Sequence, residues 1–499
     1  SSEDEGGAAW TDDAAGARLC LGQADDQVAY CTCGKPLRRV AKLPGHAALL
    51  ACSSALECIR CGEDILPGEL HFKCRDCKGT HVCKDCGPGV YIEQTFDFFD
   101  SLTHERDVQE IPARVLHQRK ARQQRRRAST TRGVTLDGGH LDDDLLAMKM
   151  ADQVVQNAVV MASEVMSEGS DVYDKEWRDE GTLCRLLGTS SESQSFDAMR
   201  LMVEAVTRMH MRQETLQDVK APCKVYGDIH GQLRDLLMLF GTFGMPGSPE
   251  SPTAVFNGDF VDRGKHQVEV VCLLFALKLV HPSNVFLNRG NHEDQNMNVK
   301  YGFHKACLAA FNDYGQSLFD SIAASFNYLP LASLIEEKIL VVHGGIGHGN
   351  WAIDDLRKVK RPLKHSDLQQ EKNQWLWNLL WSDPIEDDER ASTHKVFGVH
   401  SSPRGKLAVK FGWNVTQAFC ARNGLDLVIR SHQAKRCGLG FDVMHNESLI
   451  RVFSARDYEG HNNDCAVLSV FDLAEGERDA SDEKVLTVRP QVLSSITHQ

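Results

Sequence analysis

Short apolar runs that end at glycine, asparagine or histidine dominate the second half of the sequence. They lie at 224–226, 254–256, 285–287, 339–342 and 427–429, and a polar loop or a helical pattern follows each. Such runs are typical of buried strands. A longer apolar stretch at 267–280 predicts a buried helix. Alternation of strand, loop and helix favours an α/β fold, and such folds place their chemistry on the loops at strand ends.

Helical patterns precede these strands. Asp142-Asp143-Asp144 favours a helix N-terminus. Apolar residues then recur at spacings of three, four or seven, at Leu145, Met148, Val155, Val159, Ala162 and Met166. A second helical stretch covers about 195–215. We therefore predict six segments: a flexible tail (1–28), a Cys/His-rich module (29–112), a basic linker (113–140), a helical connector (141–194), the α/β domain (195–475) and a polar tail (476–499).

Composition narrows the class of protein. The chain has 499 residues, of which 42% are hydrophobic, so it can bury a large core in two or three domains. The net charge of −13 gives no reason to expect nucleic acid or an anionic membrane as a partner. Glu269 and Lys278 interrupt the longest apolar run, so we expect no membrane helix. From its polar, acidic N-terminus we expect no signal peptide. We expect a cytoplasmic or nuclear location.

The predicted strand ends carry side chains that bind metal ions. A lone Asp-x-His or Gly-Asp is usually only a polar turn. Here five successive strand ends each supply a suitable side chain, most of them beside a glycine: Asp228, His230, Asp259, Asn291, His292, His343 and His432. Together they can hold two divalent ions in one pocket. Oxygen and imidazole ligands without thiolate favour Mn²⁺, Fe or Zn²⁺.

Six motifs carry a resemblance to a known family. They are Gly227-Asp-Ile-His-Gly231, Gly258-Asp-Phe-Val-Asp-Arg-Gly264, Arg289-Gly-Asn-His-Glu293, Val342-His-Gly-Gly345, Trp381-Ser-Asp-Pro384 and Arg430-Ser-His-Gln433. Over about 195–470, the chain resembles the phosphoprotein phosphatase superfamily of Ser/Thr protein phosphatases, which belongs to the calcineurin-like metallophosphoesterases. The resemblance implies a central β-sandwich flanked by helices, with the active site on the loops at one edge.

The resemblance also implies residue roles. Asp228, His230 and Asp259 would hold the first metal ion, and Asp259, Asn291, His343 and His432 the second. His292 would be the general acid for the leaving oxygen, oriented by Asp262. Arg263, Asn291, Arg404 and Tyr458 would bind the phosphate. Arg404 fits this role better than Arg390 or Arg422. Arg456 and Glu459 depart from the family pattern, as do the surroundings of Arg404, and both departures bear on substrate preference.

The function implied is hydrolysis of phosphoserine and phosphothreonine on proteins, with a hydroxide between the metal ions as nucleophile. Two alternatives remain. One is another metallophosphoesterase, such as a dinucleoside tetraphosphate hydrolase, against which the Trp381–Pro384 and Arg430–Gln433 motifs argue. The other is an inert phosphatase-fold scaffold in which only the N-terminal module acts. The filled ligand positions argue against a scaffold.

The cysteines cluster near the N-terminus. Ten of the 17 precede residue 90, and three Cys-x-x-Cys pairs in about thirty residues predict zinc binding. The segment resembles ZZ-type zinc fingers. Cys58, Cys61, Cys83 and Cys86 would then share one ion. Cys74 and Cys77 would share a second ion with a further pair, which is supplied by downstream histidines such as His104 or by Cys31 and Cys33. We expect one or two structural zinc ions and a protein partner for this module. A disulfide cluster is the alternative, but nothing else in the sequence indicates secretion.

The basic linker contains Arg125-Arg126-Arg127-Ala128-Ser129. We favour a solvated linker. A kinase site at Ser129 and a nuclear import signal are alternatives, and nucleic-acid binding is third because no aromatic residues interleave the charges.

Overall fold

The computed structural model describes residues 141–169, 177, 181–386, 396–472 and 486–497, and the backbone of seven short N-terminal strands. These strands are β1 (Gly22–Gln23), β2 (Ala29–Tyr30), β3 (Leu37–Val40), β4 (Leu56–Glu57), β5 (Asp64–Ile65), β6 (His71–Cys74) and β7 (His81–Cys83). The strands β3, β6 and β7 pair antiparallel in the order β3–β6–β7. The predicted zinc ligands Cys31, Cys33, Cys58, Cys61, Cys77 and Cys86 lie outside the described residues, as do the side chains of Cys74 and Cys83 and the basic linker.

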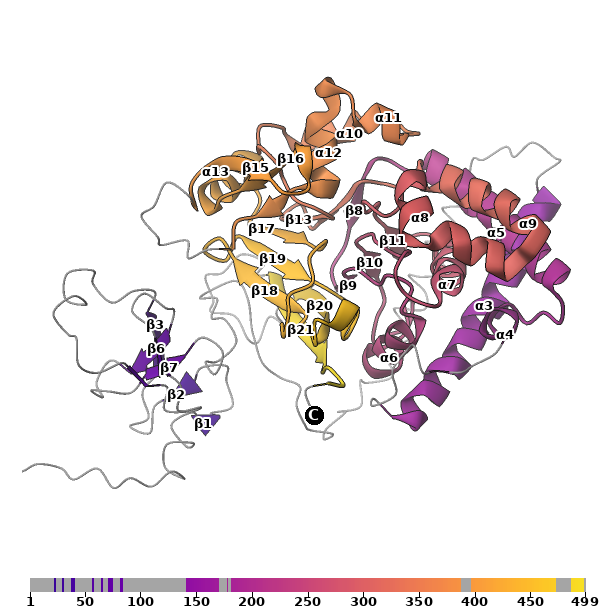
Figure 1. The fold of residues 1–499 in the computed structure, drawn as a ribbon, viewed down its shortest axis with the longest axis horizontal. Coiled ribbons are helices and arrows are strands. Elements are labelled where there is room, and N and C mark those ends of the chain that lie inside the picture. The colour runs from indigo at the N-terminus through magenta and orange to yellow at the C-terminus, as the bar shows by residue number, and fades with distance from the viewer. Residues whose placement is uncertain are drawn as a thin grey trace, which may run out of the picture.

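Two sheets packed face to face form the centre of the molecule (Figure 1). The first has the order β11–β10–β9–β20–β21, with bounds Val285–Leu287, Ala254–Phe256, Cys223–Tyr226, Cys465–Asp472 and Leu486–Leu493. The strands β9, β10 and β11 are parallel, whereas β20 and β21 are antiparallel to their neighbours. Three carboxyl ends of this sheet therefore point to the same edge.

The second sheet has the order β18–β19–β17–β13–β12–β8. Its strands span Phe441–Met444, Leu449–Val452, Leu427–Arg430, Ile339–Val342, Ala332–Ile335 and Leu216–Val219. Alternate side chains of both sheets share one buried cluster, in which Val225 and Val255 meet Val341 and Ile429. Because successive strand residues face opposite ways, each sheet keeps a second apolar face for helices. The predicted β-sandwich flanked by helices is confirmed.

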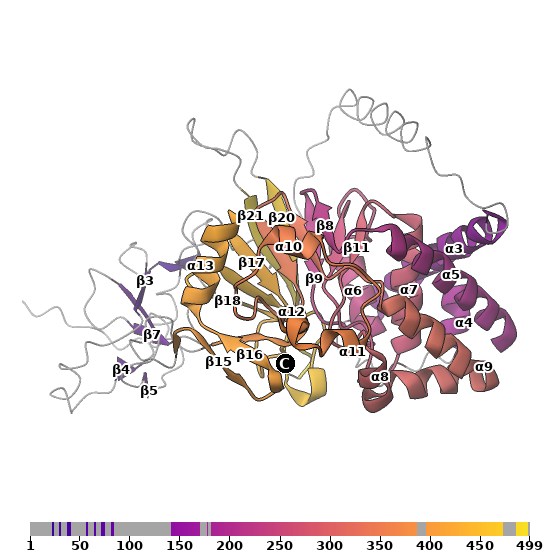
Figure 2. The same cartoon turned by 90° about the horizontal axis from the view of Figure 1, so that it is seen from above.

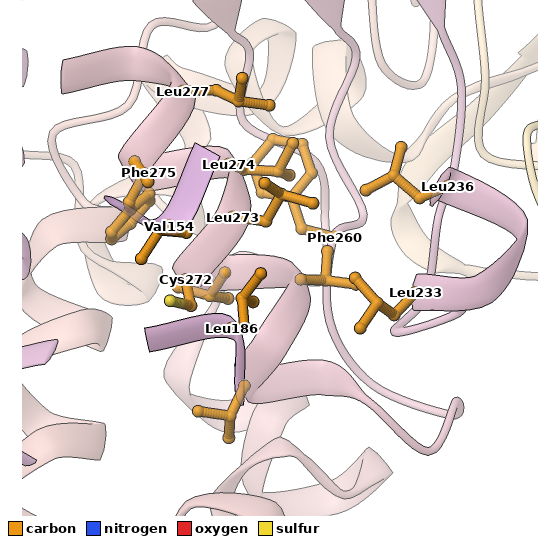
Figure 3. Close-up of a cluster of buried hydrophobic side chains, with 14 of the residues drawn as sticks. Val154, Leu186, Leu233, Leu236, Phe260, Cys272, Leu273, Leu274, Phe275 and Leu277 are labelled. Atoms are coloured by element: carbon orange, nitrogen blue, oxygen red, sulfur yellow. The ribbon is translucent and has the colours of Figure 1, made fainter. Parts of the chain in front are cut away.

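One helical layer covers the outer face of the first sheet (Figures 1 and 2). Its helices are α3 (Leu141–Glu168), α4 (Thr182–Leu187), α5 (Glu192–Arg212), α6 (Leu233–Phe243), α7 (Gln267–Val280), α8 (Gln295–Tyr301) and α9 (Phe303–Phe326). Figure 3 shows apolar side chains of α3, α4, α6 and α7 gathered in this core. Helix α7 is buried almost all round. Its Lys278 ammonium donates to the carbonyls of Pro282 and Val285, which satisfies the buried cation.

The second sheet is covered by shorter elements that pack against its outer face. They are α10 (Ile353–Arg357), α11 (His365–Leu368), a 3₁₀ turn at Glu371–Asn373, α12 (Gln374–Trp381) and α13 (Trp413–Asn423). A small sheet of order β14–β16–β15 lies beside them, with strands Asp383–Pro384, Gly405–Phe411 and Val399–Ser402. Among the described helices, none combines the length and the apolar character needed to cross a bilayer.

Helix α3 exists as predicted, but only part of the apolar pattern that predicted it is buried: Ala162 lies in the core and Val155 packs against it. Leu145, Met148 and Val159 are exposed, and the core instead receives Ala147, Ala151, Val154, Ala158, Met161 and Val165. Small alanines let α3 approach its neighbours closely, and the segment predicted as a connector joins the same core as α5, α6 and α7.

The C-terminal segment also differs from its prediction. The tail predicted at 476–499 contains strand β21, which pairs along β20 and buries Leu486 and Val488 in the sandwich. Apolar residues alternate with Thr487 and Arg489, which is the period of a half-buried strand. Pro490, which cannot donate to a ladder, is tolerated because β21 is an edge strand.

Candidate active site

Side chains from five strand ends meet at one edge of the sandwich. Asp228 follows β9, Asp259 follows β10, Asn291 follows β11, His343 follows β13 and His432 follows β17. The two sheets also touch here, because Asp228 forms an isolated parallel bridge with Phe453, just beyond β19. The site is thus built where the parallel strands of both sheets end.

One group of ligand atoms surrounds His343. Its Nε2 lies 2.9 Å from Asn291 Oδ1, 3.3 Å from Asp259 Oδ1 and 3.3 Å from His432 Nδ1. The ligand atoms of Asp259, His343 and His432 all lie within 4.8 Å of one another. These are the residues that the resemblance assigns to the second metal ion.

A second group surrounds His230. Its Nε2 lies 3.6 Å from Asp259 Oδ2 and 3.9 Å from Asp228 Oδ2. By distance alone, His292 also groups with His230 and Asp259. Its Nδ1, however, is 2.7 Å from Asp262 Oδ2, so His292 is paired with that carboxylate. Asp259 borders both groups.

Backbone carbonyls fix the tautomers of the two central histidines. His230 Nδ1 donates to the Val261 carbonyl at 2.8 Å, and His343 Nδ1 donates to the Asn257 carbonyl at 2.8 Å. In the neutral form of each imidazole, the Nε2 lone pair therefore faces carboxylate or amide oxygens. Lone pairs that converge in this way repel one another unless a cation lies between them, so the donor set fits divalent metal ions.

The charges of the buried groups in the cluster also fit bound divalent metal ions. Burial and the nearby charge of Asp259 raise the pKa of Asp228 to about 7. Burial lowers the pKa of His343, yet Asp259 and Asp228 outweigh it and raise that pKa to about 9. Both shifts follow from an excess of buried negative charge, which divalent cations would offset.

His292 and Asp262 form a separate hydrogen-bonded pair beside these ligands. Asp262 also accepts from Asn298 Nδ2 and from the Phe303 backbone N–H, each at 3.0 Å, so its carboxylate is held in place. The His292 backbone N–H donates to Asp259 Oδ1. Burial lowers the pKa of His292, but the charges of Asp259 and Asp262 outweigh it and raise the pKa above its ordinary value. The imidazole can therefore hold a proton near neutral pH.

Cationic and phenolic side chains surround the ligand cluster. The Arg263 guanidinium lies over the Tyr301 ring, 4.2 Å from its centroid. Arg404 donates to the His432 carbonyl at 3.3 Å, and the Tyr458 ring stacks on His230 with 5.0 Å between centroids. These three predicted phosphate-binding side chains thus lie at the cluster, as does the fourth, Asn291.

The Trp381–Pro384 and Arg430–Gln433 motifs meet at one carboxylate. Asp383 Oδ1 accepts from Arg430 at 2.9 Å, and Asp383 Oδ2 accepts from Arg404 at 2.5 Å. Both motifs therefore help to hold Arg404 near His432. Arg422, in contrast, donates to the carbonyls of Gly349 and Trp351, and Arg390 lies outside the described residues.

Several site residues have an uncommon backbone conformation. Left-handed φ values occur at His230 (47°), Asp259 (55°), Asp262 (68°), Arg263 (73°) and His432 (69°). Each such residue costs of order 1–3 kcal/mol and persists only where its surroundings impose it. Gly258 and Gly290 bring two of these loops into contact, since a Cβ on Gly258 would lie 2.3 Å from the Gly290 nitrogen.

Glu293 holds these strained loops, a role that sequence reasoning missed. Its buried carboxylate accepts from the backbone N–H groups of Asp259, Phe260 and Gly290 at 2.7–2.8 Å. Glu293 ends the Arg289–Glu293 motif, but its three backbone donors come from two loops. Spacing along the sequence does not reveal these contacts. Glu293 positions Asp259 without facing the ligand cluster as a ligand itself.

Glu293→Gln is expected to lower the free energy of unfolding by about 1–3 kcal/mol, because the new amide N–H₂ faces buried backbone donors. Activity should fall as well, since the Asp259 loop loses its anchor. Chemical denaturation measures the first effect, and hydrolysis of a phosphate ester measures the second. Glu337→Gln, at an exposed position, is the matched control. Unchanged stability together with unchanged activity would contradict this role.

Comparisons with known proteins match this part of the chain. Residues 222–436 match the calcineurin-like phosphoesterase family. The chain is 41% identical over 235 residues to Serine/threonine-protein phosphatase T of Aspergillus oryzae, covering 47% of this chain and 45% of that protein. It is 35% identical over 275 residues to Serine/threonine-protein phosphatase BSL2 of Arabidopsis thaliana, covering 54% of this chain and 26% of that protein. The chain thus spans less than half the length of either curated relative.

A solved structure is also similar. It is a protein serine/threonine phosphatase from Saccharomyces cerevisiae with similarity to human phosphatase PP5, at 31% identity and a TM-score of 0.51. The match covers 62% of this chain and 91% of that one.

Proposed function

Because this chain belongs to the Ser/Thr protein phosphatase family of calcineurin-like phosphoesterases, we propose that it hydrolyses phosphoserine and phosphothreonine on proteins. The observation that carries the proposal is the convergence of ligand atoms from five strand ends beside two guanidinium groups. Asp228, His230 and Asp259 would hold one divalent ion, and Asp259, Asn291, His343 and His432 the other. Bound there, two such ions neutralise phosphate charge and make water a better nucleophile. Mn²⁺, Fe and Zn²⁺ suit these ligands.

The side chains around the ions would bind and orient the ester. Arg263 and Arg404 offer planar donor pairs that match phosphate oxygens, and Asn291 and Tyr458 border the same space. When both ring nitrogens of His292 are protonated, Nδ1–H donates to Asp262 and Nε2–H is left to face the ester. That proton can pass to the departing serine or threonine oxygen. Asp262 keeps the imidazole charged and aimed.

We also infer that the N-terminal Cys-x-x-Cys pairs bind structural zinc and that this module recruits a protein partner. The support is their spacing in the sequence. Elemental analysis of the intact chain counts such zinc ions beside the catalytic pair. An intact chain that purifies without zinc contradicts the inference.

Hydrolysis of a phosphoserine peptide, with loss of activity on chelation and recovery on adding Mn²⁺, is the expected result for the purified chain. A dinucleoside tetraphosphate assayed in parallel tests the other metallophosphoesterase chemistry. Efficient cleavage of the dinucleotide without peptide hydrolysis would replace the proposal. If the chain binds its metal ions but hydrolyses neither the peptide nor the dinucleotide, the scaffold alternative holds.

A further inference from the structure

The Arg263 guanidinium, which we assign to phosphate binding, already forms an ion pair with a glutamate. Arg263 Nη1 donates to Glu459 Oε1 at 2.7 Å, although the two residues are 196 positions apart in the chain. The side chains are 31% and 45% exposed, respectively, so a ligand can reach both. Glu459 is one of the residues at which the sequence departs from the family pattern.

Arg263 has little freedom to leave this contact by moving. Its guanidinium lies over the Tyr301 ring at 4.2 Å, and its backbone N–H donates to the Tyr301 carbonyl at 3.2 Å. Tyr301 is itself packed against His292, with 5.2 Å between ring centroids. The guanidinium is therefore fixed beside the general acid, and Glu459 is the partner that has to yield to a phosphate.

The loop that carries Glu459 is built to present it. Asp457 and Glu459 have left-handed φ values of 48° and 47°, which are unfavourable for residues other than glycine. Asn463 holds the loop by accepting from the Tyr458 N–H at 3.0 Å. The Asp457 carboxylate accepts from the Ile496 N–H at 2.9 Å and from the Ser495 hydroxyl at 2.5 Å. Contacts from two segments thus maintain a strained backbone that sets Glu459 beside Arg263.

We propose that Glu459 is a specificity-determining residue that competes with phosphate for Arg263 and, once displaced, selects substrates with a lysine or arginine beside the phosphorylated residue. The inference rests on the proposed function. A bound phosphate takes the Arg263 donors and leaves the Glu459 carboxylate next to a second anion. A cationic substrate side chain relieves this repulsion, whereas an acidic one increases it.

Glu459→Gln tests the proposal, because it removes the charge and keeps the shape. The expected result is a Ki for inorganic phosphate about two- to fivefold lower, the range for losing an exposed ion pair. Phosphoserine peptides that differ only in a lysine, alanine or glutamate next to the phosphoserine report selectivity. The unaltered chain should prefer lysine over glutamate through KM, and the variant should lose most of that preference. Glu371→Gln, an exposed change of the same charge, should alter neither quantity.

Each outcome separates this inference from the proposed function. Suppose that the unaltered chain and Glu459→Gln both hydrolyse all the peptides, with the same phosphate Ki and the same peptide preference. This result overturns the role of Glu459 and leaves the proposed function intact. If the unaltered chain hydrolyses no phosphopeptide, the proposed function fails. Phosphate binding by calorimetry then still decides whether Glu459 competes for Arg263. Thermal unfolding and metal content of the variant confirm that its fold is intact.

Discussion

His292→Asn is expected to lower kcat for phosphoserine peptides by about 10²–10⁴-fold, the usual contribution of a general acid, while the metal content stays unchanged. Asparagine can still donate to Asp262, so the local packing survives, but it cannot give a proton to the leaving oxygen. An aryl phosphate such as p-nitrophenyl phosphate has a better leaving group. Its hydrolysis should therefore fall less than that of the peptide.

The difference between the two substrates identifies the cause of the loss. A merely structural role for His292 predicts equal losses for both. His304→Asn is the matched control, since His304 lies on α9 and hydrogen-bonds Gln316 away from the site. Retained peptide turnover in His292→Asn would remove the general-acid assignment.

Asp259→Asn is expected to abolish hydrolysis of both substrates and to reduce the active-site metal content from two ions to one or none. The reason is that Asp259 borders both ligand groups and contacts both His230 and His343. Elemental analysis gives the metal content. A second readout needs no activity: Mn²⁺ should raise the Tm of the unaltered chain by mass action and should leave that of the variant nearly unchanged.

Comparison with His292→Asn completes this test. Both variants lose peptide hydrolysis, but only Asp259→Asn should lose its metal-dependent stabilisation. Two bound ions in Asp259→Asn, or recovery of full activity in excess Mn²⁺, would show that Asp259 is not shared between two metal ions.

The strand ends could be predicted because apolar runs and their terminal glycines are local signals. The predicted runs at 254–256 and 285–287 coincide with β10 and β11, and the helix at 267–280 coincides with α7. Parallel strands then bring their ends to one edge, so a ligand cluster could be expected from position along the chain. The comparisons support the family that these motifs indicate.

Other features depend on contacts that no local signal records. The buried face of α3 is the one that packs closely against neighbouring helices. Ala147 and Ala151 therefore face the core, whereas Leu145 does not. Glu293 serves two loops at once. Glu459 reaches Arg263 from a distant segment, and the sequence showed only that its charge was unusual for the family. Such pairings follow from the folded geometry alone.

The left-handed backbone of the site restricts which amino acids evolution or an engineer can place there. His, Asp and Asn are the non-glycine residues most enriched at such φ values, and they are also good ligands for divalent ions. A β-branched residue in place of Asp259 or His432 would disfavour the left-handed backbone at that position, whatever its ability to bind a metal ion. Attempts to retune the metal preference should therefore vary side chains that hold these residues, such as Glu293, which accepts from the Asp259 backbone N–H, and leave the ligands themselves unchanged.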